Sequence, residues 1–317
     1  MGVKEKNKII ILIGQTASGK TNTAIRLAKE IGGEVVSADS RQVYKHLNIG
    51  SDKITTDGMQ GVRHHLIDIA DPLTETYTVS DFIQDSTAAI KDIQARGKVP
   101  IVAGGTMLYI DALFGNILVP EVPPNPTLRA ELEQHSSTSL FKELLLKDKR
   151  RAEQMKQEDQ SGNKRRLIRA LEIVEKLGHV PDSSDTQPTN TLLAENEVLW
   201  LGLHNDPVLQ KEKINKRNAE MLDQGLLSEV KDLAARGVQQ EQFNTFGFEY
   251  KYPAMYLSNI PIIKEEEPTI EQVLMKMNSG TWRYAKKQRA WWADREEINW
   301  FKPLEYEKLI TRVNNFL

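Results

Sequence analysis

The eight residues Gly14-Gln15-Thr16-Ala17-Ser18-Gly19-Lys20-Thr21 match the phosphate-loop pattern GxxxxGK[ST]. An apolar run, residues 9–13, precedes them and predicts a strand, and the apolar spacing of residues 23–29 predicts a helix. Glycines let backbone N–H groups turn toward phosphate oxygens, the helix N-terminus adds positive potential, and Lys20 adds a charge. The segment therefore predicts an anion-binding loop in which the Thr21 hydroxyl can ligate Mg²⁺. The phosphate-binding residues expected here are Gly14, Thr16, Ala17, Ser18, Gly19, Lys20 and Thr21.

Composition narrows the class of protein. The chain has 317 residues, of which 39% are hydrophobic, a formal charge of −2 and no cysteine. The near-zero charge excludes a uniformly basic protein, so any nucleic-acid contact must come from local patches. The absence of cysteine excludes disulfides and thiolate metal sites. Apolar runs are too short to span a membrane and no signal peptide is evident, so we expect a cytoplasmic protein without membrane contact.

Alternating apolar runs and helical patterns predict the fold class. Four further runs read as buried parallel strands, at residues 34–38, 65–69, 99–103 and 198–203. This alternation indicates an α/β protein with a P-loop NTPase-like, doubly wound parallel sheet. A proline-rich break at residues 120–126 begins a mainly helical insertion, which we place at 117–197. The α/β core then comprises 1–116 and 198–317, and its C-terminal part contains helical stretches at 205–233 and 270–293.

Residues that follow the strands are the candidates for chemistry, because ligands of such sheets bind beyond the carboxyl ends of the strands. Asp39 follows the second strand and can act as a general base or as a magnesium ligand through water, or it can simply cap a helix. Gly104-Gly105-Thr106 follows the fourth strand. Taken singly it reads as a plain strand-to-helix turn, but beside the phosphate loop it predicts a second glycine turn at the same cleft. The adjacent histidines His64 and His65 point to opposite faces of a strand, which favours structural roles over metal binding.

Two segments concentrate positive charge. Residues 147–169 contain nine Lys/Arg against four Asp/Glu, and residues 276–295 contain six against one. The second segment also carries Trp282, Tyr284, Trp291 and Trp292. Such charge runs are often just solvated helix faces, but basic and aromatic residues together are also the pattern expected for gripping a phosphate backbone and stacking on bases.

Seven motifs in order resemble those of the bacterial-type tRNA dimethylallyltransferases, also called tRNA isopentenylpyrophosphate transferases, over nearly the whole chain. The motifs are residues 14–21, Ser37-Ala38-Asp39-Ser40-Arg41-Gln42-Val43-Tyr44, Asn48-Ile49-Gly50, His64-His65-Leu66-Ile67-Asp68, Gly104-Gly105-Thr106-Met107-Leu108-Tyr109, Arg165-Arg166-Leu167-Ile168-Arg169-Ala170-Leu171-Glu172 and Arg283-Tyr284-Ala285-Lys286-Lys287-Gln288.

The resemblance implies transfer of a dimethylallyl group from dimethylallyl diphosphate to N6 of adenine 37, next to the tRNA anticodon. It implies that the phosphate loop holds this diphosphate with Mg²⁺ and that the catalytic residues are Asp39, Thr106 and Arg217. Asp39 would be the base and Thr106 a hydroxyl at the reacting centre, while Arg217, with Lys20 and Thr21, would bind the diphosphate and magnesium. The insertion would grip the tRNA anticodon stem-loop, and we expect the enzyme to be a monomer. The tRNA contacts implied are Ser40, Gln42, Arg165, Arg166, Arg169, Arg283, Lys286, Lys287 and Gln288.

The chain departs from the family pattern in four outer segments, namely residues 50–54, Arg63, residues 246–251 and residues 290–292. Three other functions share parts of the pattern. A small-molecule P-loop kinase or a free-adenylate isopentenyltransferase would not need the helical insertion. An NTP-gated RNA-binding module would bind RNA in a salt-dependent way and transfer nothing.

Overall fold

The computed structural model describes residues 6–182, 191–264 and 266–317. They form two compact units. The first contains the described residues up to Phe114 and from 191 to the end, and the second contains those from Gly115 to 182.

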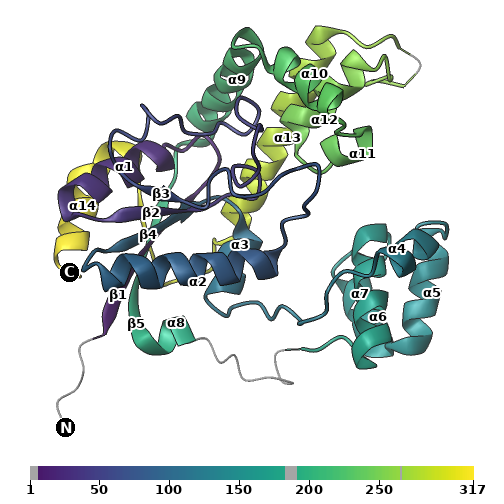
Figure 1. The fold of residues 1–317 in the computed structure, drawn as a ribbon, viewed down its shortest axis with the longest axis horizontal. Helices are drawn as coiled ribbons and strands as arrows, with labels where there is room; N and C mark the ends of the chain where they lie inside the picture. Colours follow the sequence, from purple (N-terminus) through teal and green to yellow (C-terminus); the bar gives the residue numbers. More distant parts are fainter. Residues whose placement is uncertain (1–5, 183–190, 265) are drawn as a thin grey trace. The chain divides into compact units, whose positions relative to one another are not determined.

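A parallel sheet forms the centre of the first unit (Figure 1). Every pairing in it is parallel, which confirms the expected fold class. In spatial order the strands are β3 (His64–His65), β2 (Glu34–Ala38), β4 (Pro100–Gly104), β1 (Asn7–Gly14), β5 (Asn196–Leu203) and β6 (Ile298–Phe301).

Helices cover both faces of this sheet, which explains why its strands read as continuous apolar runs. The face formed by Ile10 and Leu12 packs against α1 (Lys20–Ile31) and α14 (Tyr306–Asn314), which the short turn η1 (Pro303–Glu305) precedes. The face formed by Ile11 and Ile13 packs against α2 (Val79–Ala95) and α3 (Met107–Leu113). Burial on both faces holds the carboxyl ends of β1, β2 and β4 in fixed positions.

One strand assignment made from the sequence was wrong, and one strand was missed. The strand expected at 65–69 is only the pair His64–His65, because the backbone at Leu66 and Asp68 turns left-handed, with φ of 64° and 56°. That conformation cannot continue a β ladder. The edge strand β6 was not expected at all, since its four residues carry no alternating pattern long enough to detect.

A group of helices packs beside the sheet around a separate core that includes Val43, Leu47 and Tyr250. The helix expected at 205–233 is two helices, because Gly225 adopts a φ of 99° between them. These helices are α9 (Pro207–Asp223), α10 (Leu226–Arg236), α11 (Gln240–Phe243), α12 (Phe248–Leu257) and α13 (Ile270–Trp291).

The second unit is helical and has its own core, which includes Leu140, Leu167 and Leu171. Its helices are α4 (Pro126–Leu132), α5 (Ser137–Lys147), α6 (Lys149–Gln157) and α7 (Lys164–Leu177). The short helix α8 (Thr191–Glu195) belongs to the first unit, although the sequence placed it within the insertion. No helix among the described residues is both long and apolar enough to cross a membrane.

Candidate active site

Three segments that lie far apart in sequence meet at the carboxyl edge of the sheet. Gly104 pairs with Ile13 on one side and with Ala38 on the other. The residues that follow each strand are therefore neighbours in space. A Cβ at Gly104 would lie 2.1 Å from the carbonyl oxygen of Ala38, so only glycine allows this approach.

The phosphate loop has the backbone of an anion site. Ala17 and Gly19 adopt left-handed conformations, with φ of 59° and 93°, and Gly19 precedes the first residue of α1. Among the described residues, the N–H groups of Gly19, Lys20 and Thr21 meet no protein acceptor. The buried Ser18 hydroxyl is likewise without a hydrogen-bond partner. These donors can bind an anion at the helix N-terminus, as sequence analysis expected.

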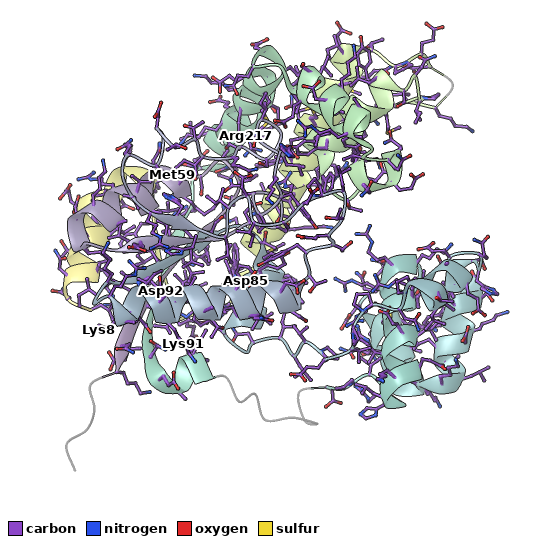
Figure 2. The ribbon with its side chains drawn as sticks, viewed as in Figure 1. Lys8, Met59, Asp85, Lys91, Asp92 and Arg217 are labelled. Carbon is purple, nitrogen blue, oxygen red and sulfur yellow. The ribbon has the colours of Figure 1, made fainter. Side chains whose placement is uncertain are left out.

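The loop is fixed from outside by two helices of the C-terminal half, through all three polar groups of Thr16. Its N–H donates to Gln288 Oε1 on α13 over 2.7 Å, and its hydroxyl accepts from Arg217 Nη1 on α9 over 2.7 Å. Its carbonyl accepts from the buried Gln210, also on α9. Arg217 is labelled on the fold in Figure 2. The loop is thus positioned before any ligand binds.

Lys20 lies over this loop and carries a perturbed charge. Its Nζ donates to the carbonyl oxygens of Gly14 and Gln15 over 3.1 and 2.7 Å. Burial lowers the pKa of Lys20 to about 8, Asp39 partly offsets that effect, and Arg217 lowers the pKa further. An anion placed here would restore the full charge of Lys20.

Asp39 uses one carboxylate oxygen to order its own turn and keeps the other accessible. Its Oδ1 accepts from the N–H groups of Arg41 and Gln42 over 2.8 and 3.3 Å. These bonds close a turn; no helix begins there, so Asp39 is not the helix cap that the sequence had offered as an alternative. Its Oδ2 accepts no hydrogen bond from the described part of the chain. Thr106 lies beside it, because the Thr106 hydroxyl accepts from the N–H of Ser40 over 3.1 Å.

A buried carboxylate lies next to these groups. Glu249, at the start of α12, is 2% exposed and accepts hydrogen bonds from Arg41 Nη1 at 2.7 Å, Thr281 Oγ1 at 3.0 Å and Arg217 Nη2 at 3.3 Å. Burial alone would raise the pKa of Glu249, but the two guanidinium groups outweigh that effect and hold it below its usual value. Glu249 is therefore an anion that joins two cations of the site.

These elements enclose a cavity of about 650 Å³ within the first unit. Its volume suits a small charged ligand together with part of a larger one. Residues from every sequence-predicted catalytic and phosphate-binding group line it, including Thr16–Thr21, Asp39, Thr106 and Arg217. Glu249, Arg41 and Tyr284 line it as well.

The oxygen atoms that face this cavity fit a magnesium ion whose other ligands are waters and the phosphate oxygens of a bound substrate. The Thr21 hydroxyl is exposed and has no partner among the described residues, and Asp39 Oδ2 is free in the same sense. The described residues contain no cluster of three or more potential His, Asp or Glu ligands. Mg²⁺ keeps waters and takes substrate phosphate oxygens in such sites, so a sparse donor set is sufficient.

Three of the residues predicted to contact tRNA in the first unit instead make hydrogen bonds within the protein. Gln288 is 1% exposed, and its amide joins Thr16 to the carbonyl of Gly105. We therefore reassign it from RNA contact to positioning of the phosphate loop. The amide of Gln42 donates to the carbonyls of Ser51 and Asp52, and the N–H of Ser40 donates to Thr106. Ser40, Gln42 and Gln288 all line the cavity.

The basic face of α13 is open to solvent, whereas its aromatic residues are divided. Arg283, Lys286 and Lys287 are exposed, and Lys286 lies 6.0 Å from the ring centroid of Trp282. Trp292 is fully buried in the core under the sheet, so the expectation that it stacks on bases was wrong. The indole N–H of Trp291 donates to Asp111, although the side chain remains partly exposed.

In the second unit, most of the basic segment forms internal ion pairs. Arg169 donates to Glu172 over 2.6 Å and to the carbonyl of Val122 over 2.8 Å. Arg165 and Arg166 are exposed and have no acidic partner among the described residues. These two arginines remain candidates for RNA phosphates, whereas Arg169 has a structural role within its helices.

The histidine pair has structural partners. His65 Nε2 lies 2.8 Å from Glu34 Oε2, and His64 Nδ1 lies 2.9 Å from the carbonyl of Val62.

Sequence reasoning missed several residues of the site. Arg41 lies in the motif at residues 37–44, but the motif gave it no role of its own. Glu249 and Gln210 lie outside the motifs and enter the site because α12 and α9 fold over the loop. The one available signal for Glu249 was its position in a segment that departs from the family pattern.

Fold and site together define a P-loop α/β protein whose sheet edge combines an anion-binding loop with an accessible carboxylate. The sequence model of the IPP transferase family matches residues 42–295. A tRNA dimethylallyltransferase from Bacillus mycoides is 34% identical over 97% of this chain and 94% of its own length. The chain belongs to the IPP transferase family.

Solved structures agree with this assignment. The tRNA isopentenylpyrophosphate transferase from Bacillus halodurans is 33% identical, with a TM-score of 0.68 over 98% of this chain and 95% of its own. A eukaryotic dimethylallyltransferase described as acting on tRNA is 26% identical, with a TM-score of 0.80 over 98% of this chain and 79% of its own. The family resemblance read from the motifs is confirmed.

Proposed function

We propose that the protein transfers the dimethylallyl group of dimethylallyl diphosphate to N6 of adenine 37 in tRNA, releasing diphosphate. The observation that carries this proposal is the shared cavity, in which a phosphate loop and the accessible oxygen of Asp39 face the same space. Membership of the IPP transferase family supports it.

The diphosphate end of the donor binds at the phosphate loop. The free N–H groups of Gly19, Lys20 and Thr21 and the charges of Lys20 and Arg217 converge there. As the bond between the allylic carbon and oxygen breaks, negative charge grows on the leaving diphosphate. Fixed donors and cations stabilise that charge more than the ground state, which is the condition for catalysis.

Asp39 accepts the proton from the adenine amino group. The exocyclic nitrogen is a poor nucleophile because its lone pair is delocalised into the ring, so removal of its proton lowers the barrier. The turn that Oδ1 makes with the N–H groups of Arg41 and Gln42 orients the carboxylate and leaves Oδ2 for this task. Thr106, which bonds to the same turn, offers its hydroxyl at the reacting centre.

Mg²⁺ would be held by the Thr21 hydroxyl together with diphosphate oxygens. When bound, it supplies charge neutralisation at the leaving group. The remaining work of binding, orientation and proton transfer belongs to the residues of the chain.

The acceptor is a base in the anticodon loop. A base in a single-stranded loop can turn out into a pocket at small cost. Exposed cations on α13, with Arg165 and Arg166 of the helical insertion, supply the contacts to the RNA backbone. We infer a monomer that uses both units on one tRNA.

The decisive experiment incubates the protein with Mg²⁺, labelled dimethylallyl diphosphate and unmodified tRNA. Label on adenine 37 is the expected result. Label on free adenylate in place of tRNA would identify an adenylate isopentenyltransferase. Turnover of ATP with no transfer of label would identify a kinase and refute the proposal.

A further inference from the structure

The Glu249 carboxylate forms the centre of a charged cluster beside the phosphate loop, although no step of the proposed reaction uses it. One oxygen, Oε2, accepts from Arg41 at 2.7 Å. The other, Oε1, accepts from Thr281 at 3.0 Å and from Arg217 at 3.3 Å. The side chain is 2% exposed, so these contacts replace its hydration. A buried carboxylate persists only where such partners compensate its desolvation.

The backbone around Glu249 is shaped to accommodate this cluster. Gly247 adopts a φ of 107°, and a Cβ on it would lie 2.6 Å from Arg41 Nη1 and 3.2 Å from Glu249 Oε2. Only glycine leaves room for the ion pair. The cluster is therefore built into the fold at the start of α12 rather than formed by mobile surface side chains.

Each arginine also touches a part of the site where chemistry is proposed. Arg217 Nη1 donates to the Thr16 hydroxyl of the phosphate loop at 2.7 Å and lies 3.6 Å from Asp52 Oδ2. Arg41 supplies the backbone N–H that holds Asp39 Oδ1 at 2.8 Å. Through these two arginines, Glu249 connects the diphosphate site with the turn of the proposed base.

The cavity is lined by more cations than carboxylates, so loss of Glu249 would increase an existing excess of positive charge. The cations are Lys20, Arg41, Lys53, Lys213, Lys216 and Arg217, and the carboxylates are Asp39, Asp52, Glu220 and Glu249. Like charges around one cavity repel each other, and the guanidinium groups would reorient toward solvent or toward any bound anion. Arg41 binds Glu249 through Nη1 only, whereas Arg217 uses Nη2 for Glu249 and Nη1 for Thr16, and its buried Nε has no hydrogen-bond partner among the described residues. Both guanidinium groups line the cavity, where a ligand can approach them.

We propose that Glu249 is a positioning residue, which holds Arg41 and Arg217 in place and limits the positive potential at the diphosphate site. The inference rests on the proposed function, since it assigns the arginines to the leaving diphosphate. Glu249 thereby favours release of the diphosphate and orientation of the arginines over tight binding. Without its charge, the cluster would bind the ground state and the product diphosphate too tightly.

The test measures binding and transfer separately in Glu249→Gln. The amide is nearly isosteric but removes the negative charge. We expect inorganic diphosphate with Mg²⁺ to bind about fivefold more tightly by calorimetry, because one compensating charge is lost near the anion. We expect kcat for prenyl transfer to tRNA to fall about tenfold or more, because the arginines are no longer oriented.

Glu172→Gln is the matched control. Glu172 is also a buried carboxylate with two arginine partners, but it belongs to the helical insertion and does not line the cavity. The diphosphate affinity of the Glu172→Gln variant should equal that of the wild type. Glu249→Asp, which keeps the charge, should return diphosphate affinity to the wild-type value and recover part of kcat.

Thr281→Val provides a second test if Glu249→Gln does not fold. It removes one hydrogen bond to the carboxylate but keeps the charge, so kcat should fall several-fold at unchanged diphosphate affinity. Diphosphate binding that is unchanged or weaker in Glu249→Gln would overturn the proposal, as would equal kcat in Thr281→Val and wild type. The diphosphate measurement needs no tRNA, so failure of prenyl transfer in the wild type would refute the proposed function without deciding the binding result.

Discussion

Glu249 and Glu172 are both buried carboxylates that bind arginines, but they lie in different regions of the molecule and have different roles. Both carboxylates are 2% exposed, and each binds two arginines. Glu172 binds Arg129 through both oxygens at 2.8 Å and also accepts from Arg169 at 2.6 Å. Glu249 binds each of its arginines through one nitrogen only.

The two clusters differ in whether a ligand can reach their arginines. In the insertion, Glu172 also accepts from the N–H of Asn125, and Arg169 donates Nη2 to the Val122 carbonyl. None of these residues lines the cavity, and the network ties helices together. At the cleft, Arg41 and Arg217 line the cavity beside the anion-binding loop, and Arg217 also donates to Thr16. Two carboxylates with similar burial thus belong to different kinds of cluster, one structural and one open to a ligand, and the distinction is whether their arginines line the cavity.

The largest effect that would sharpen this contrast is expected at Asp39 in the cleft. Asp39→Asn removes the proton acceptor but keeps an oxygen for the turn, so kcat for prenyl transfer should fall by about 10³-fold. Diphosphate binding, measured by calorimetry, should survive because the phosphate loop is untouched. Full activity in this variant would remove Asp39 as the base and leave the cleft without one.

Glu172→Gln should act on stability instead. Breaking a buried carboxylate–arginine network by loss of one partner costs about 3–5 kcal/mol. We expect the helical unit of the variant to unfold earlier than that of the wild type, as measured by hydrogen exchange. Diphosphate binding should be preserved. An unfolding transition equal to that of the wild type would show that the Glu172 network is not structural.

The same residue should give the insertion a characteristic response to acid. Burial alone would raise the pKa of Glu172, but Arg129, the Asn125 N–H and Arg169 lower it from 4.5 to about 2. A lowered folded-state pKa means that the stabilisation is complete above pH 4.5 and is lost as the pH falls toward 2. Acid unfolding of Glu172→Gln should lack this component, and an identical acid profile would contradict the assignment.

At the cleft, the pH response should run in the opposite direction. The pKa of Lys20 is lowered to about 8, chiefly by burial, so the ligand-free lysine loses its charge as the pH rises through that value. Diphosphate affinity should then weaken by about tenfold per pH unit above 8, relative to Lys20→Arg, whose side chain stays charged. Parallel pH profiles for the two proteins would show that Lys20 is charged throughout.

The smallest effect is expected at the exposed arginines of the insertion. Arg165→Gln with Arg166→Gln removes two cations that have no acidic partner among the described residues. The KM for tRNA should rise several-fold, and the salt dependence of tRNA binding should weaken by about two counterions. Arg129→Gln serves as the contrast, because it disturbs the Glu172 network rather than an open surface. An unchanged salt slope in the double variant would place the RNA contacts elsewhere.

Much of the site could be predicted because phosphate-loop chemistry is local in sequence. The loop needs glycines, a lysine and a helix start within eight residues, and the structure has them in that order. Asp39 and Thr106 were recognisable because they follow strands of a parallel sheet. The short β3 and the unexpected β6 were not, because two or four residues give no periodicity and a left-handed turn gives no composition signal.

The sequence by itself determined the class of fold and the anion-binding loop, since continuous apolar runs and glycine spacing depend only on neighbouring residues. Only the tertiary structure decided which charges act together. Arg41, Arg217 and Glu249 are up to 208 residues apart in sequence, and the packing of α9 and α12 against the sheet edge brings them into contact. Gln288 likewise changed from a candidate RNA contact to a support of the loop, because burial and two hydrogen bonds, which no local pattern encodes, set its role.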